Sequence, residues 1–349
     1  MSIPHAQEMA QALVDWFTTH GRDYPWRRTT DPWAILVSEI MLQQTTIPTV
    51  QGRYEAWMQQ FPTPAHLAAA SEEEALLSWE GLGYYRRVRS LQAAARAIVE
   101  HHDGKFPTAE QDIRALPGIG DYTVGALLSF AFNQPAPLVD ANVSRVFSRL
   151  FNDHTPIDSP AGRKSHWKWA AEMVYATQPR SYNSALMELG QTLCTNGQPN
   201  CHYCPLRNWC QAKNPALLPI KLPKKEITQL EHHDIFLLSP AGLLLEKQTQ
   251  GNRHEGMYRL PRRPAEVCAA FPQLARQTYS ITRYKVTRHL YRAHEGTEAL
   301  PGEKFIPLEK LSSTPMAAPD RKIIEKHLPR EAAGVPGTAP TGIEPISAL

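Results

Sequence analysis

The sequence changes its pattern near residue 215, and this change constrains the fold more than any single motif. Before this point, apolar residues recur at intervals of three and four, as they do along segment 6–20, where they form one helical face. After residue 230 the segments HDIFLLSP, GLLLEKQ and YKVTRHLYRAH are short, rich in β-formers and bounded by Gly, Pro or Asn. We therefore predict a mainly α-helical region over 1–215, a linker over 216–230 and an α+β domain over 231–328.

The first region should contain several helices separated by short Gly and Pro breakers. Asp31 and Pro32 predict a helix start, because Asp caps free amides and Pro is tolerated at the first helical position. The helix after them is apolar almost all round and is expected to be buried. Further helices are expected at about 65–79, 86–99, 111–116, 123–132, 142–150 and 165–175.

Composition excludes several classes and leaves the partner open. The 37 Lys and Arg residues nearly balance the 34 Asp and Glu residues, so the net charge of +3 does not indicate a partner. No apolar run approaches the roughly 20 residues of a membrane span, and the first residues lack the features of a signal peptide. We expect a cytoplasmic monomer that does not bind membranes, with a disordered tail over 329–349.

Four of the five cysteines form a compact group in the sequence. Cys194, Cys201, Cys204 and Cys210 follow the spacing C-x6-C-x2-C-x5-C, while Cys268 stands alone. Such a group in a reducing compartment indicates a metal site. Four thiolates hold either zinc or a [4Fe–4S] cluster, and the ligand type alone does not decide between them.

The strongest local motif is LPGIGDYT at residues 116–123. Gly118 and Gly120 frame one apolar residue between two expected helices, which favours a tight hairpin whose amides face outward. Amides beside a helix N-terminus bind phosphate, so the hairpin predicts contacts with a DNA backbone. A plain loop between helices is the alternative.

Two carboxyl groups are candidates for acid–base chemistry. Glu39 lies within the apolar segment ILVSEIML, where burial should raise its pKa toward neutrality; a buried salt bridge is the alternative. Asp140 precedes Asn142 and taken alone could be an N-cap. Cleavage of a glycosidic bond commonly uses two carboxyl groups.

Five stretches together resemble the adenine DNA glycosylases of the MutY family, in the helix-hairpin-helix, iron–sulfur glycosylase superfamily. They are VSEIMLQQT (37–45), GLGYYRRVRSL (81–91), LPGIGDYTVGALLSFAF (116–132), VDANVSRV (139–146) and the cysteine loop (194–210). The resemblance is dense over about 8–215 and weaker over about 230–328. It implies a six-helix barrel lobe, an iron–sulfur cluster lobe with a [4Fe–4S] cofactor, and a C-terminal Nudix-like domain.

The resemblance also implies residue roles. Glu39 would protonate adenine N7 and Asp140 would stabilise C1′ of the sugar, with Tyr122 and Asn142 positioning these groups. Gln44 and Tyr84 would wedge into the base stack, and Trp26 and Arg27 would line the adenine pocket. Related enzymes that cut the strand carry a lysine where this chain has Tyr122, so we expect a monofunctional glycosylase.

The sequence departs from the family pattern in three places. Ala141 and Tyr24 replace a usual Gly and a common Leu. In the second domain, Ile281, Thr282 and Arg283 stand where the family has a Phe-Ser-His loop that contacts 8-oxoguanine. We expect Thr282 and Arg283 to contact DNA there, and the run of glutamates of Nudix hydrolases is missing.

These observations predict a glycosylase that excises adenine mispaired with 8-oxoguanine or guanine in duplex DNA, initiating base excision repair. The alternative is a related glycosylase that removes thymine or uracil opposite guanine, because the 281–283 loop is altered. A DNA-binding module without activity would not need both Glu39 and Asp140.

Overall fold

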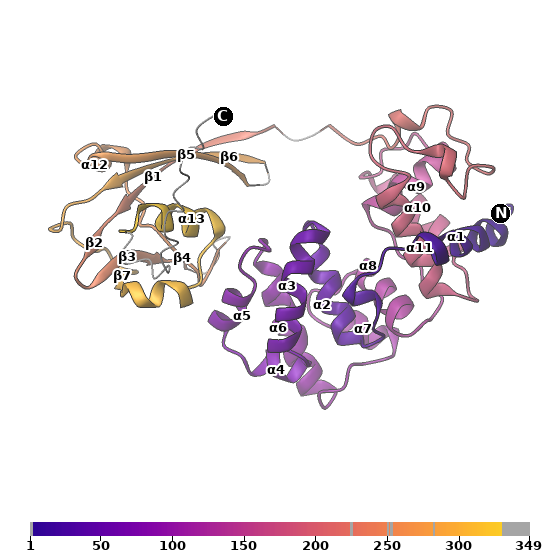
Figure 1. Cartoon of the computed structure of the whole chain (residues 1–349), viewed down its shortest axis with the longest axis horizontal. Helices are drawn as coiled ribbons and strands as arrows, with labels where there is room; N and C mark the ends of the chain where they lie inside the picture. The colour runs from indigo at the N-terminus through magenta and orange to yellow at the C-terminus, as the bar shows by residue number, and fades with distance from the viewer. Residues whose placement is uncertain (1–2, 224–225, 250, 252–253, 282, 330–349) are drawn as a thin grey trace, which may run out of the picture. The chain divides into compact units, whose positions relative to one another are not determined.

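A computed structural model of the chain describes residues 3–223, 226–249, 251, 254–281 and 283–329. The chain divides into two compact units, Met1–Glu226 and Ile227–Leu349 (Figure 1). The first is helical and the second contains the strands, as the change of pattern predicted. Most of the predicted tail, from residue 330 onward, lies outside the described residues.

The first unit is built from helices joined by short loops. They are α1 (Ala6–His20), α2 (Pro32–Leu42), α3 (Ile47–Gln60), α4 (Pro64–Ala69), α5 (Glu72–Ser78), α6 (Arg86–His101), α7 (Glu110–Ala115), α8 (Asp121–Ala126), α9 (Ala141–Leu150), α10 (Pro160–Met173) and α11 (Pro179–Thr192). A π-helical turn, η2 (Leu127–Ala131), extends α8, and 3-10 turns η1, η3 and η4 occupy Pro25–Arg27, Cys201–Tyr203 and Pro215–Leu217.

Two groups of helices give this unit its two lobes. Helices α2 to α6 pack together, and α4 and α6 make the densest contacts among them. Helices α1, α9, α10 and α11 surround a second apolar core that includes Leu13, Phe147 and Leu189 (Figure 1). The Asp31 carboxylate caps α2 by accepting bonds from the amides of Trp33 and Ala34, as predicted.

The expected helix over 65–79 is wrong, because the structure has two helices there. Ala70 is extended, with ψ near 148°, and ends α4. The Ser71 hydroxyl then accepts from the Glu74 amide, while the Glu74 carboxylate accepts from the Ser71 amide. This capping box starts α5.

The second unit contains two small sheets. In one, β6 (Tyr284–Arg292) lies between β1 (Thr228–Phe236), to which it is parallel, and β5 (Gln273–Ile281), to which it is antiparallel. In the other, β3 (Gly242–Lys247) pairs antiparallel with β2 (Leu238–Ser239), β4 (Tyr258–Arg259) and β7 (Glu303–Ile306). Helices α12 (Ala265–Cys268) and α13 (Ala318–His327) and a 3-10 turn, η5 (Leu308–Ser313), complete the unit.

The second unit begins earlier than the predicted boundary at residue 231. Strand β1 starts at Thr228, inside the expected linker, because the Thr228 amide donates to the Arg283 carbonyl and pairing with β6 begins there. No helix in the described part of the chain is both long and apolar enough to cross a membrane.

Candidate active site and cysteine loop

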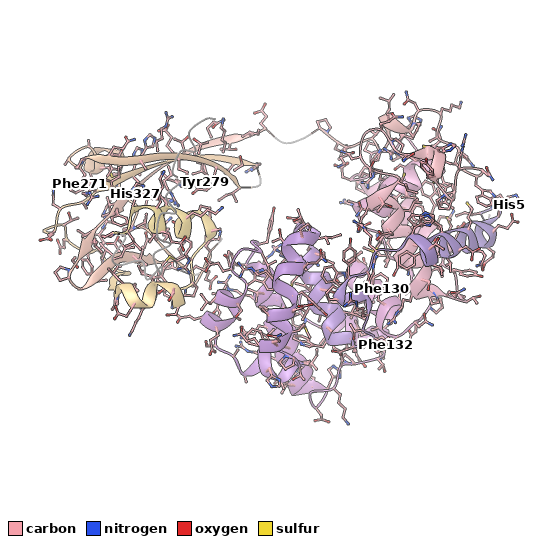
Figure 2. All side chains as sticks on the ribbon, in the orientation of Figure 1. His5, Phe130, Phe132, Phe271, Tyr279 and His327 are labelled. Carbon is pink, nitrogen blue, oxygen red and sulfur yellow. The ribbon has the colours of Figure 1, made fainter. Side chains whose placement is uncertain are left out.

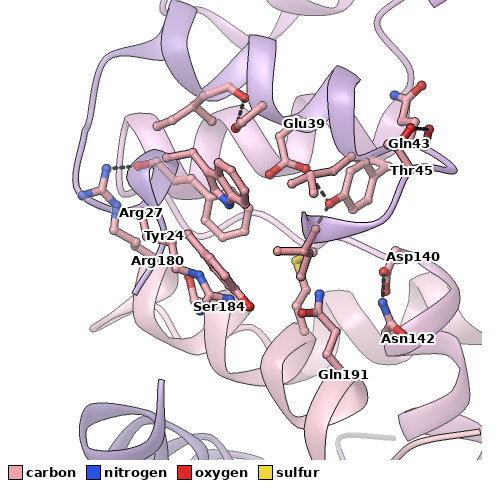
Figure 3. Close-up of a pocket in the computed structure, with 18 of the residues that line it drawn as sticks. Tyr24, Arg27, Glu39, Gln43, Thr45, Asp140, Asn142, Arg180, Ser184 and Gln191 are labelled. Carbon is pink, nitrogen blue, oxygen red and sulfur yellow. Dashed lines mark hydrogen bonds between the residues drawn. The ribbon is translucent and has the colours of Figure 1, made fainter. Parts of the chain in front are cut away.

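A cavity of about 670 Å³ lies in the first unit where α2, α8, η2, α9 and α11 meet (Figure 3). It is bordered by all four predicted catalytic residues, both predicted adenine-pocket residues and one predicted wedge residue: Glu39, Tyr122, Asp140, Asn142, Trp26, Arg27 and Gln44. The structure therefore gathers in one place residues that the chain spreads over more than 100 positions.

Glu39 is a buried carboxyl group on α2. Its side chain is only 5% exposed, and the Tyr122 hydroxyl donates to its Oε2 at 2.6 Å. Burial raises the pKa of Glu39 to about 7, although the bond from Tyr122 opposes the rise. The group is therefore partly protonated near neutral pH, as its apolar sequence context predicted, and no direct ion-pair partner for it is found among the described residues.

Asp140 is the N-cap of α9 and also borders the cavity. Its Oδ1 accepts from the Val143 amide at 2.7 Å, and its Oδ2 accepts from Asn142 Nδ2 at 2.8 Å. Burial raises the pKa of Asp140, and these two bonds act against the rise by stabilising the anion. The capping role and a chemical role are thus compatible, since Oδ2 still faces the cavity beside Asn142 (Figure 3).

Arginines on α9 connect this carboxylate to the cysteine loop. The Arg145 guanidinium donates to Asn142 Oδ1 at 2.9 Å and to the Cys194 carbonyl at 2.7 Å. One turn further, the buried Arg149 donates to Cys194 Sγ at 3.3 Å and to the Thr195 carbonyl at 2.7 Å. The position of Asp140 therefore depends on the same helix that orders the loop.

A buried ion-pair network lies behind Arg27, which lines the cavity. Glu188 of α11 is fully buried, and it accepts from Arg27 Nη2 at 2.8 Å and from Arg22 Nε. Sequence reasoning missed Glu188 and Arg22. Glu188 lies in SALMELG, a charge within an apolar helical segment, which is the same signal that identified Glu39.

Aromatic side chains cover much of the remaining wall. Trp26 is 8% exposed and packs edge-on against Tyr54, with ring centroids 5.5 Å apart. Phe130, labelled in Figure 2, borders the cavity from η2, and Arg180 of α11 donates to its carbonyl. A π-helical turn re-aims side chains relative to an α-helix, which here places Phe130 in the wall.

The two predicted wedge residues lie on neighbouring loops and share one anchor. Gln44 and Tyr84 both have positive φ values, 57° and 46°, and both are exposed. The buried Arg87 donates to the carbonyls of Gln43 and Leu82, and so joins the two loops. Tyr84 does not border the cavity, whereas Gln44 does.

The predicted hairpin joins α7 to α8. Gly118 has φ of 77°, and a Cβ there would approach the Ser90 side chain to 2.5 Å, so the hairpin needs glycine at this position. At Gly120 the space is open. Among the described residues, no hydrogen bond uses the amides of Gly118 and Gly120, which remain available to an external acceptor.

The four clustered cysteines border a separate cavity of about 160 Å³. No three side chains of His, Cys, Asp or Glu in the described part of the chain are placed to hold a single metal ion. The thiols of Cys194, Cys201, Cys204 and Cys210 instead surround a space, with Arg149 beside them. Four sulfur donors around a cavity can hold a metal centre, and the donor type alone does not decide between zinc and a [4Fe–4S] cluster.

The predicted lesion loop is described only in part. Thr282 lies outside the described residues. Arg283 is exposed at the turn between β5 and β6, where its guanidinium stacks 5.1 Å from the Tyr284 ring centroid and donates to the Tyr284 hydroxyl at 3.1 Å. It belongs to the second unit.

This combination of a helical unit, a glycine hairpin and a pocket with two carboxyl groups defines a class of DNA repair proteins. The model of the HhH-GPD superfamily base excision DNA repair proteins matches residues 37–172. Among solved structures, a thermostable thymine-DNA glycosylase shares 28% identity with a TM-score of 0.55, covering 59% of this chain and 95% of that one. An endonuclease III–DNA complex shares the fold at 22% identity and a TM-score of 0.51, covering 60% and 96%.

Comparison with individual proteins identifies the family within this superfamily. Adenine DNA glycosylase of Mycolicibacterium smegmatis is 40% identical over 207 residues, which are 58% of this chain and 70% of that protein. The human adenine DNA glycosylase is 42% identical over 211 residues, covering 58% of this chain and 39% of the human protein. The chain belongs to the adenine DNA glycosylase family. It spans less than half the length of the human and Arabidopsis thaliana relatives, at 39% and 46%.

Proposed function

We propose that this chain is a monofunctional DNA glycosylase that excises adenine mispaired with 8-oxoguanine or guanine in duplex DNA. The observation that carries the proposal is that the buried Glu39, whose pKa is raised, and the hydrogen-bonded Asp140 border one cavity. The names of the relatives support adenine over thymine or uracil as the excised base. The proposed setting is a cytoplasmic monomer acting on DNA.

The two carboxyl groups have different tasks in this reaction. Glu39 donates its proton to N7 of the flipped adenine, which makes the base a better leaving group. Asp140, held by Val143 and Asn142, stabilises the positive charge that develops at C1′ as the bond breaks. Tyr122 keeps Glu39 in place, and because it carries no amine it forms no Schiff base with the sugar.

Binding and flipping use the surface around the cavity. The free amides of Gly118 and Gly120 donate to a DNA phosphate, which positions the protein without reading sequence. Extruding a base costs a few kcal/mol. Gln44 and Tyr84, on the loops joined by Arg87, fill the space that the base leaves in the stack.

The four cysteines would hold a [4Fe–4S] cluster in this proposal. Their cavity and donor set fit it, and Arg149 offers charge compensation to the Cys194 sulfur. The cluster would order the 194–210 loop, which Arg145 links to Asn142. Purified protein should be brown and contain about four irons per chain; a colourless protein with one zinc would contradict this assignment.

Single-turnover assays on a panel of duplexes test the substrate. Adenine opposite 8-oxoguanine or guanine, thymine opposite guanine and uracil opposite guanine are incubated with excess enzyme, and free base and strand breaks are measured separately. We expect adenine release without strand cleavage. Release of thymine or uracil in preference to adenine would support the alternative glycosylase instead.

A further inference from the structure

The Tyr24 side chain is part of the cavity wall, and its hydroxyl is unused. Tyr24 is 6% exposed and lies directly before η1, the turn that also carries Trp26 and Arg27. Within the described residues, no hydrogen bond uses the Tyr24 hydroxyl. A hydroxyl in a cavity wall without a protein partner is available to whatever enters the cavity.

The charged groups near Tyr24 are already committed to one another. Both carboxylate oxygens of Glu188 accept from arginines, Oε1 from Arg22 and Oε2 from Arg27. Arg22 also donates to Gln191 Oε1 at 2.7 Å, and Arg27 donates to the Arg22 carbonyl at 2.7 Å. The Tyr24 hydroxyl is therefore a polar group at this end of the cavity that takes no part in these hydrogen bonds.

The ring of Tyr24 is nevertheless held in a fixed orientation. It stacks on Trp26 with centroids 5.2 Å apart and planes inclined by 16°. The guanidinium groups of Arg27 and Arg22 lie 5.0 and 5.4 Å from its centroid. Stacking on both an indole and cations favours a single ring position, so the hydroxyl is presented to the cavity in a defined place.

The position of Tyr24 matches the distal end of a flipped purine. Figure 3 shows Tyr24 and Arg27 on the opposite side of the pocket from Asp140 and Asn142, with Glu39 between them. When the sugar lies at Asp140 and N7 faces Glu39, the ring edge remote from the sugar, which bears the substituent at C6, faces Tyr24. This step rests on the proposed function.

We propose that Tyr24 is a specificity-determining residue whose hydroxyl oxygen accepts a hydrogen bond from the 6-amino group of the flipped adenine. Trp26 and the two arginines hold the ring, and the hydroxyl reads the substituent at C6. This role is separate from proton transfer by Glu39 and from stabilisation of the sugar by Asp140. It gives the pocket a contact that a base without the amino group does not make.

The test combines a change in the protein with a change in the base. Tyr24→Phe removes the hydroxyl and keeps the ring. Base release is followed under single-turnover conditions from duplexes with adenine or unsubstituted purine opposite 8-oxoguanine, and the second-order rate constants are compared. We expect Tyr24→Phe to slow adenine release about tenfold, equivalent to about 1.4 kcal/mol, and to leave purine release within about twofold of the wild type.

Tyr54→Phe is the matched control. Tyr54 packs on the same Trp26, and its hydroxyl donates to the Ala34 carbonyl at 3.3 Å inside the helical core. It should leave the ratio of adenine to purine release unchanged. Equal slowing of both bases by Tyr24→Phe, no slowing of either, or the same change of ratio in Tyr54→Phe would overturn the proposal. Absence of adenine release by the wild-type protein would instead refute the proposed function.

Discussion

Glu39 combines two properties in one carboxyl group, since it is almost fully buried and it borders a cavity. Its burial raises its pKa to about 7, whereas its bond from Tyr122 favours the charged form and limits the rise. The sequence predicted the burial of Glu39 from its apolar neighbours. It could not predict the Tyr122 contact from physics alone, because that contact joins residues 83 positions apart.

Burial and the bond from Tyr122 act in opposite directions on the pKa of Glu39, so removing the bond should shift the pH dependence of adenine release. If Glu39 is the acid, as proposed, its protonated form is the active one, so adenine release should fall as pH rises through about 7. Tyr122→Phe removes a bond to the charged form, so the pKa of Glu39 should rise and the fall should move to higher pH by about one unit. A pH profile of single-turnover rates measures the shift. A move to lower pH, or an unchanged profile, would be inconsistent with this role of Tyr122.

The prediction that the second unit recognises 8-oxoguanine depends on Arg283. Its guanidinium is exposed and contacts the ring and hydroxyl of Tyr284. If it contacts 8-oxoguanine, Arg283→Ala should cost about 1–3 kcal/mol of binding free energy on the duplex with 8-oxoguanine. The preference for this duplex over the duplex with guanine should then be reduced. Binding and rates are compared on the two duplexes at several salt concentrations. An equal loss of affinity for both duplexes, together with a weaker dependence of binding on salt concentration, would mean that Arg283 contacts a phosphate.

At the scale of elements, helix boundaries follow local chemistry better than periodicity alone. The sequence predicted α1, α6 and α9 to within about two residues, because each has a strong apolar stripe or a clear N-cap. It missed α3 and α11. In α3 only Val50, Tyr54 and Trp57 are buried, and in α11 small and polar residues such as Asn183 and Ser184 are buried, so neither helix shows a wide apolar face.

The close packing of α11 on α9 predicts a sensitive glycine. A Cβ at Gly190 would lie 2.7 Å from the Cβ of Asn142. Gly190→Ala should therefore displace Asn142, reduce adenine release and destabilise the first unit by about 1–3 kcal/mol. Thermal unfolding and single-turnover rates measure both effects.

Gly52 provides the matched control within a helix. It lies in α3, and a Cβ there meets no atom within 4 Å. Gly52→Ala should stabilise the protein by about 0.5–1 kcal/mol through its helix propensity and leave adenine release unchanged. If Gly190→Ala behaves like Gly52→Ala, the α9–α11 contact does not position Asn142.

At the scale of the whole molecule, the two units have separate cores and separate polar networks. In the second unit, buried Arg288 pairs with Asp234 at 2.9 Å and with Asp320 at 2.8 Å, beside Tyr279. The change of sequence pattern predicted two units, but nothing in the local pattern of β6 identified Arg288 as buried. Its charge suggested an exposed side chain, and the distant Asp234 and Asp320 explain its burial.

This network predicts that the two units respond separately to one substitution. Arg288→Met leaves the buried Asp320 without its ion-pair partner and removes one of the arginines that pair with Asp234, so it should destabilise the second unit by about 3–5 kcal/mol. Calorimetry should show one transition moved to lower temperature and the other unchanged. Arg292→Met, on the exposed end of the same strand, should move neither. A joint shift of both transitions would show that the units do not unfold separately.

The most direct test of the account is adenine release by Glu39→Gln. Glutamine keeps the shape of Glu39 but cannot deliver the proton, so release from a duplex with adenine opposite 8-oxoguanine should fall by about 10²- to 10⁴-fold while affinity for the duplex is retained. Glu55→Gln, on the exposed face of α3, should behave as the wild type. A Glu39→Gln protein that releases adenine at a near-normal rate would contradict the central claim that this buried carboxyl group is the acid of the reaction.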